Sequence, residues 1–163
     1  MIKVKMIGIK KVGFTIKLPN GVTGFYMNEG MIPPLVDEKQ FKQLCFHFAA
    51  YNGGKVIGFS PFQGNTNFYY AQMDVFNRKF FILLNKYYPY LACASVVEYE
   101  RILFMDIPPL FDQFSLYYQI VHEVDLDISA SQMLMSELNK AELKQIAYWK
   151  PQNIGQIIFN YWD

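Results

Sequence analysis

The sequence predicts an α+β protein with an antiparallel N-terminal sheet, helices packed on one face of that sheet, and a helical C-terminus. Segments of alternating apolar and polar residues come first in the chain, segments with apolar residues three and four positions apart follow, and the last quarter has a helical pattern throughout. The 163 residues, 52% of them apolar and 18% charged, suit one folded domain spanning residues 1–163.

The opening third is predicted to form strands. Residues 3–9 alternate loosely between lysine and aliphatic residues, and residues 12–18 do so again. A Pro19-Asn20-Gly21 turn signal then leads into residues 22–27, the third predicted strand.

A helix follows, because apolar residues from Phe41 to Phe48 recur on one helical face. Asp37 is its predicted N-cap, and Asn52-Gly53-Gly54 has the composition of a helix end.

The middle of the chain mixes both kinds of element. Residues 55–59 and 68–73 are predicted strands. Residues 75–87 are predicted to form a helix capped by Asp74, since their large apolar residues share a helical face. Residues 93–104 alternate and are rich in β-branched and aromatic residues, which predicts one long strand.

The remaining elements are mostly helical. Residues 108–118 are predicted to form a helix, and residues 122–128 an edge strand or an extended loop. Residues 131–138 are a predicted short helix. Asn139 and Glu142 have the spacing of a capping box for the helix that follows.

Asn153 is the predicted cap of a last helix that should dock on the body of the protein. Five apolar residues of this helix share one face: Ile154, Ile157, Ile158, Tyr161 and Trp162.

The two cysteines, Cys45 and Cys93, both lie in apolar stretches and are predicted to be buried free thiols. Lysines interrupt every apolar stretch near the N-terminus, which excludes a signal-peptide pattern, and no apolar run reaches the ~20 residues of a membrane span. These observations predict a cytoplasmic protein without membrane contact.

Acidic residues are concentrated in residues 91–139, which carry one arginine and eight Asp or Glu residues, a net charge of −7 in a chain whose total is +1. These acids are Glu98, Glu100, Asp106, Asp112, Glu123, Asp125, Asp127 and Glu137.

The sequence predicts no catalytic residue, metal or cofactor. Neither His47 nor His122 has a second ligand at zinc spacing. The acids of residues 123–127 could hold a divalent ion, but the glycine of a calcium loop is missing. Glu98 and Glu100 could form a glycosidase pair, although a solvated strand face explains them equally well.

Nucleic-acid binding is an alternative, because N-terminal lysines alternate with aromatic residues that could stack on bases. The residues concerned are Lys3, Lys5, Lys10, Lys11, Phe14, Lys17, Phe25 and Tyr26. An isoelectric point near 7.7 argues against a dedicated nucleic-acid-binding protein.

The end of the chain contains the motif Trp149-Lys150-Pro151, then Ile154-Gly155, then Ile158-Phe159-Asn160 and Trp162-Asp163. This last quarter resembles bacterial immunity proteins encoded near polymorphic or contact-dependent toxins. The resemblance implies a cytoplasmic, non-enzymatic inhibitor that binds the C-terminal domain of its cognate toxin and covers the active site. The motif is interpreted as a structural feature of the family, and the resemblance assigns no catalytic residue to this chain.

Many such toxins are nucleases with basic clefts, which an acidic surface complements. The predicted partner-binding residues are the acids of residues 98–127 and two tyrosines: Glu98, Glu100, Asp106, Asp112, Glu123, Asp125, Asp127, Tyr117 and Tyr118. A solvated acidic surface without a partner is the alternative explanation of these residues. The alternative function is a small binding module for nucleic acid or an apolar ligand.

Overall fold

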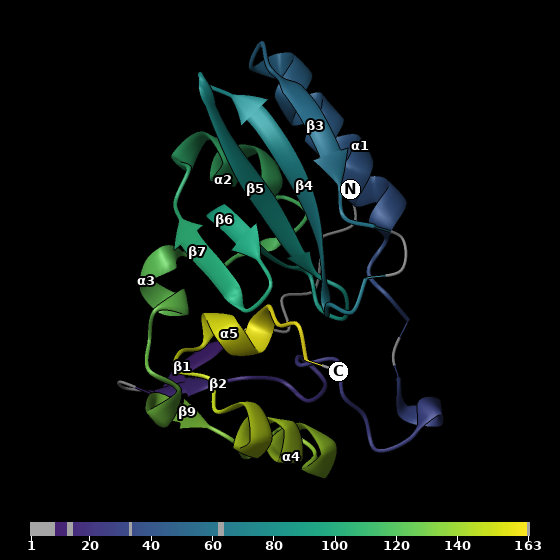
Figure 1. The fold of residues 1–163 in the computed structure, drawn as a ribbon, viewed down its shortest axis with the longest axis vertical. Helices are drawn as coiled ribbons and strands as arrows, with labels where there is room; N and C mark the ends of the chain where they lie inside the picture. Colours follow the sequence, from purple (N-terminus) through teal and green to yellow (C-terminus); the bar gives the residue numbers. More distant parts are fainter. Residues whose placement is uncertain (1–8, 13–14, 33, 62–63, 163) are drawn as a thin grey trace.

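The computed structural model describes residues 9–12, 15–32, 34–61 and 64–162. Its main feature is a twisted six-stranded sheet in which β3, β4, β5, β6 and β7 are antiparallel neighbours and the short β8 runs parallel to β6 (Figure 1). The strands are β3 (Lys55–Phe59), β4 (Phe68–Val75), β5 (Arg78–Asn85), β6 (Tyr90–Glu98), β7 (Arg101–Met105) and β8 (Gln119–Ile120).

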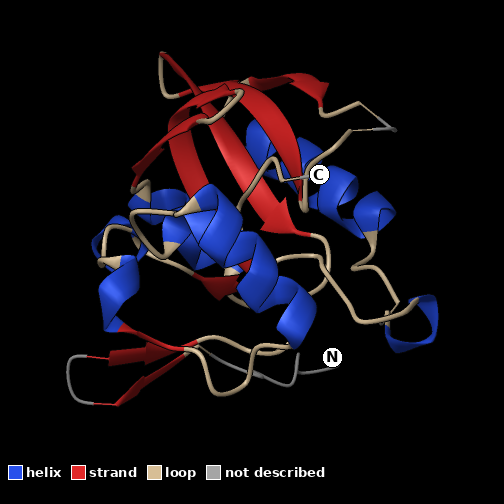
Figure 2. Cartoon of the chain, turned by 60° about the horizontal axis from the view of Figure 1, so that its bottom comes forward, coloured by secondary structure: helices blue, strands red, loops and turns tan. Residues whose placement is uncertain are grey.

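A second, three-stranded sheet lies at the other end of the molecule (Figure 2). In it β2 pairs antiparallel with β1 and parallel with β9, a strand from the last third of the chain. Its strands are β1 (Lys10–Val12), β2 (Thr15–Lys17) and β9 (Met133–Leu134).

Helices cover both faces of the large sheet. The α-helices are α1 (Glu38–Tyr51), α2 (Pro108–Phe114), α3 (Glu123–Leu126), α4 (Lys140–Trp149) and α5 (Gly155–Ile158). Two 3₁₀ turns, η1 (Glu29–Met31) and η2 (Ala130–Gln132), complete the fold. None of the helices within the described ranges is both long and apolar enough to span a bilayer.

Successive residues of β5 enter two different cores, as the pleat of a strand requires. Ile82 packs in a core with Phe41 of α1 and Phe114 of α2, whereas Leu83 packs in a core with Ile157 of α5. The second core also contains Ile16 of β2, so α5 lies between the two sheets (Figure 1).

The α+β class is confirmed, with a mostly antiparallel sheet. The arrangement differs from the prediction in two ways. The large sheet comes from the middle of the sequence and not from its start, and α5 packs on the face opposite α1 and α2. The predicted strand at residues 3–9 falls largely outside the described residues, and residues 22–27 form turns instead of a strand.

Several local predictions are confirmed. Asp37 caps α1 through a 3.1 Å hydrogen bond from the Gln40 amide. The predicted capping box of Asn139 and Glu142 is present at the start of α4. Cys45 and Cys93 are buried free thiols, and burial raises the pKa of both.

Two predicted elements in the middle of the chain are wrong. Residues 75–87 form a hairpin and β5, because a strand buried on both faces has a continuous apolar run that imitates helical spacing. Phe76 and Asn77 form its turn at positive φ, where the Phe76 ring packs on Phe48. Residues 93–104 form two strands separated by a turn at Tyr99 and Glu100.

The C-terminal half also differs from prediction. Residues 122–128 contain the helical turn α3, and residues 131–138 contain η2, β9 and turns. The last helix has four residues, since the chain becomes extended at Phe159. Docking of the tail is nevertheless confirmed: Ile154, Ile157 and Ile158 are fully buried, and Tyr161 and Trp162 pack against the same core.

Candidate partner-binding surface

The α3 helix holds most of the predicted acids that come together. Leu126 is fully buried and fixes this single helical turn to the core, which leaves Glu123, Val124 and Asp127 exposed. At its start, Asp106 Oδ1 accepts a 3.0 Å hydrogen bond from the Glu123 amide. A carboxylate at a helix N-terminus is favourable, because the first amides of a helix lack internal acceptors.

We refer to Asp106, Glu123, Asp125 and Asp127, together with Val124 of the same helical turn, as the α3 acidic surface. Val124 is 72% exposed. Neither Glu123 nor Asp127 forms an ion pair with a residue that the structure describes. The surface therefore combines negative charge with an exposed apolar centre.

His122 adjoins this surface. Its Nδ1 lies 3.8 Å from Asp106 Oδ1, and its ring makes an edge-to-face contact with Phe111, with the ring centres 4.7 Å apart. Because Phe111 belongs to α2, this contact places α2 beside the start of α3. The two helices therefore adjoin at the Phe111–His122 contact.

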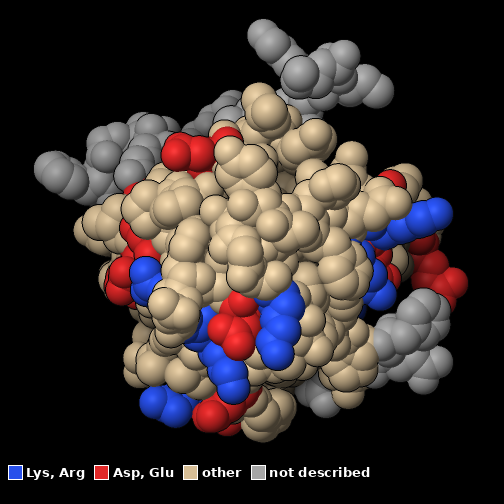
Figure 3. All heavy atoms as spheres, turned by 90° about the horizontal axis from the view of Figure 1, so that it is seen from above, with Lys and Arg blue, Asp and Glu red and all other residues tan. Residues whose placement is uncertain are grey.

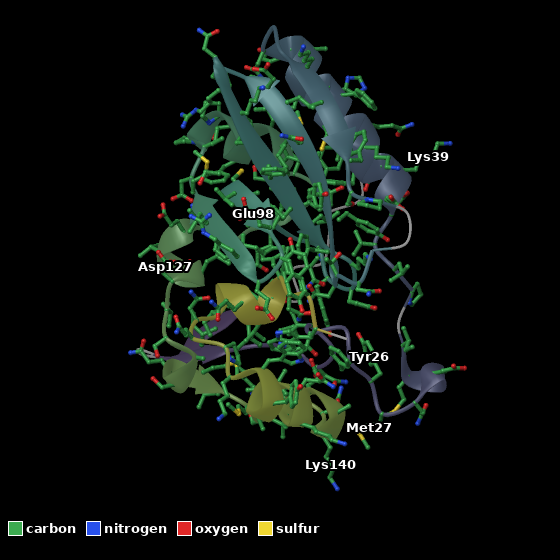
Figure 4. The ribbon with its side chains drawn as sticks, in the orientation of Figure 1. Tyr26, Met27, Lys39, Glu98, Asp127 and Lys140 are labelled. Carbon is green, nitrogen blue, oxygen red and sulfur yellow. The ribbon has the colours of Figure 1, made fainter. Side chains whose placement is uncertain are left out.

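Glu98 and Glu100 lie apart from α3, at the hairpin between β6 and β7. Glu98 forms an ion pair with Arg101, with 3.4 Å between Oε2 and Nη1. Figure 4 shows Glu98 beside β6 and β7 and Asp127 at the outer end of α3. The prediction of one strand face holding Glu98 and Glu100 is wrong, because Glu100 stands in the turn that separates the two strands.

Asp112 and Tyr117 lie at another place, a hollow of about 410 Å³ between α1 and the α2 region. His47 and Tyr51 of α1 line the opposite wall of this hollow. Asp112 therefore faces α1, whereas Phe111 of the same helix faces α3.

Tyr118 is not an exposed anchor, contrary to expectation. It is 3% exposed and packs between Phe41 and Phe114 in the core beneath α1. Burial raises its pKa well above that of an ordinary tyrosine, with smaller contributions from Cys45 and Asp37. Its side chain has no surface to offer a partner in this fold.

Other charged regions are more balanced than α3. Viewed from above, Lys or Arg and Asp or Glu side chains lie next to one another (Figure 3). Charges of both signs also alternate across the large sheet, because Asp74 of β4 is paired with Lys55 of β3 on one side and with Lys79 of β5 on the other. Such mixed charges do not build a field of one sign.

Carboxylates on one surface could hold a metal ion or attract a positively charged partner. Within the described ranges, no group of three or more His, Cys, Asp or Glu side chains is placed to hold a metal ion.

The exposure of Val124 was not predicted from the sequence. The prediction for residues 122–128 is an edge strand or an extended loop, in which Val124 and Leu126 would lie on the same side; in a helix, residues two apart point in nearly opposite directions. Glu123 and Asp125 in the first turn of a helix are the signal that favours the correct interpretation.

Comparison of the chain with protein-family models, curated proteins and solved structures finds no match. The resemblance of the tail to toxin-immunity proteins thus stays a prediction.

Proposed function

We propose that this protein is an immunity protein: a non-enzymatic cytoplasmic inhibitor that binds the C-terminal nuclease domain of a cognate bacterial toxin and covers its active site. The tail motif supports the family, and the α3 acidic surface supports the mode of binding. The exposed carboxylates of Glu123 and Asp127 without described ion-pair partners are the observation that carries the proposal.

A nuclease cleft is basic because it binds phosphates, so an acidic surface of the inhibitor complements it. Long-range attraction between the two raises the association rate, and burial of a central apolar residue slows dissociation. Asp127 and Glu123 would speed association with the toxin, and Val124 would slow dissociation from it.

The contact would extend beyond α3, since a specific interface covers about 800 Å² on each partner. The Phe111–His122 contact joins α2 to α3, which makes α2 the neighbouring part of the interface. Asp112 and Tyr117 at the α1–α2 hollow would form its edge, and the hollow could accept an apolar side chain of the toxin.

The test is to mix the purified protein with the C-terminal domain of the toxin encoded beside its gene, and to measure affinity and nuclease activity. We expect binding tighter than micromolar and loss of nuclease activity at equimolar ratio. Weaker binding with unchanged nuclease activity would refute the proposal.

A pair of charge reversals locates the interface. Glu123→Lys and Glu29→Lys change the same residue type, each exposed and each the first residue of a single helical turn. We expect Glu123→Lys to slow association about tenfold at low salt, and less at high salt, because screening weakens steering. Glu29→Lys should leave the association rate within about twofold of the wild type.

A further inference from the structure

A groove of about 330 Å³ opens between the β6–β7 hairpin and the C-terminal segment. Its apolar walls include Phe104 of β7, Trp149 at the end of α4, and Trp162 of the tail. All three side chains are half-buried, and Phe104 and Trp162 also pack against the core that contains Ile157. We call this the tail groove.

Two charges of opposite sign line the tail groove from different elements. Glu100 comes from the hairpin turn and Lys150 from the end of α4, and both are exposed. Neither forms an ion pair with any residue in the described part of the chain. Each charge is therefore available to a ligand.

The backbone is left-handed at both charges, and Lys150 is the C-cap of α4. Glu100 has φ +58° and Lys150 has φ +50°, and they are two of the four non-glycine residues with positive φ in the described chain. Lys150 also precedes Pro151, a position at which extended backbone is normal. Glycine would adopt either conformation without strain, so a glycine substitution at either position removes a charge without disturbing the backbone.

We propose that the tail groove binds a small zwitterion with an apolar body, such as a free apolar amino acid or a dipeptide. The ammonium group would approach Glu100, the carboxylate would approach Lys150, and the apolar body would lie against Trp149 and Trp162. A ligand with a single charge would leave one of the two protein charges without a counterion, so charge complementarity selects a ligand that carries both.

The size of the groove also selects a small ligand, because its volume is at the lower end of the range for ligand pockets. Two amide side chains, Gln152 and Gln156, complete the polar part of the lining. The tail groove involves different residues from the α3 acidic surface, so this inference does not depend on the proposed toxin.

Tryptophan fluorescence reports on this groove alone, because the only two tryptophans of the chain, Trp149 and Trp162, both line it. The probes are leucine, phenylalanine and the dipeptide Leu-Phe, and the comparison compounds are phenethylamine and 3-phenylpropionate, which carry one charge each. We expect a saturable fluorescence change, with at least tenfold tighter binding of a zwitterion than of either single-charge compound. Tighter binding of the dipeptide or of the amino acids shows which of the two reaches both Glu100 and Lys150.

Glycine variants separate binding from folding. Glu100→Gly and Lys150→Gly remove the charges and relax the backbone, so the thermal midpoint should stay equal or rise while the affinity for the zwitterion falls at least tenfold. Asn77→Gly is the matched control, since it relaxes another positive-φ residue at a hairpin far from the groove lining and should leave the affinity unchanged.

Three results would each overturn the proposal: no saturable fluorescence change with any zwitterion, equal affinity for the single-charge compounds, or wild-type affinity in both charge-removing variants. A toxin domain that perturbs tryptophan fluorescence when the zwitterions do not would also overturn it, and would assign the groove to the protein interface instead.

Discussion

Thr23 Oγ1 donates a 2.6 Å hydrogen bond to Glu142 Oε2, although the two residues are 119 positions apart in the sequence. The Glu142 carboxylate is fully buried and also accepts hydrogen bonds from the amides of Gly21, Thr23 and Asn139. The same side chain thus completes the capping box of α4 and holds the turn that follows β2. One carboxylate therefore links residues 21–23 to the first turn of α4 by hydrogen bonds.

Glu142→Gln should destabilise the protein by about 2–3 kcal/mol, because an NH₂ group would replace one acceptor oxygen among donors that have no other acceptor in the described part of the chain. Chemical denaturation followed by circular dichroism measures the change. The control Glu29→Gln neutralises an exposed carboxylate and should change the free energy of unfolding by less than about 0.5 kcal/mol. Equal stability of the two variants would contradict the role given to Glu142.

Gly155→Ala should destabilise by about 1–3 kcal/mol, since a methyl group at this position of α5 would overlap the ring of Phe104. Glycine there lets α5 approach β7 closely. Gly58→Ala in β3 is the control, because its methyl group would meet nothing within 4 Å. Equal stability of Gly155→Ala and Gly58→Ala would contradict the prediction, and would mean that the Phe104 ring shifts without loss of folding free energy.

Tyr118→Phe should raise the free energy of unfolding by about 1 kcal/mol. The Tyr118 hydroxyl is buried and has no hydrogen-bond partner among the described residues, so its removal relieves an unsatisfied polar group. Thermal denaturation below neutral pH, where no tyrosine ionises, measures the effect. Tyr148→Phe, at a side chain that is 75% exposed, is the control, and a loss of stability in Tyr118→Phe would indicate a buried water bound to the hydroxyl.

Val124→Ser should weaken toxin binding about tenfold, close to 1.4 kcal/mol, mainly through faster dissociation. Val124 is exposed in the free protein, so the fold should be as stable as the wild type. Ile32→Ser removes an apolar side chain that is 47% exposed elsewhere, and it should leave binding unchanged. Equal affinities of the two variants would move the apolar centre of the interface away from α3.

Features that depend on neighbours in the sequence could be predicted. The Asp37 cap, the Asn139–Glu142 capping box and the burial of Ile154 and Ile157 all follow from local spacing. Features that depend on distant contacts could not. The period of β5 is hidden because Phe80 and Leu83 are both fully buried, one in each core.

The candidate site shows the same division. The charge pattern of the sequence identified the acids of residues 98–127, but it could not show that they lie at separate places in the fold. Asp112 faces α1, and Glu98 is already paired with Arg101. The α3 turn depends on Asp106 as a cap from outside the helix, and no sequence spacing predicts such a contact.

Alkaline pH should destabilise the protein through Tyr161. Burial raises the pKa of this tyrosine from the usual 10.0 to about 12, with smaller contributions from Tyr70 and Glu98. Below pH 10 both the folded and the unfolded chain keep the proton. Between pH 10 and about 12 the unfolded chain loses it first, so the free energy of unfolding falls as pH rises through this window.

The measurement is the thermal midpoint as a function of pH, for the wild type and for Tyr161→Phe. The thermal midpoint of the variant should fall less steeply above pH 10. Tyr161 is then absent, so its ionisation can no longer favour the unfolded chain at alkaline pH. Part of the slope should remain, since burial also raises the pKa values of Tyr26 and Tyr90. Tyr51→Phe, at an exposed side chain, is the matched control, and a Tyr161→Phe profile that superimposes on the wild type would show that Tyr161 titrates alike in both states.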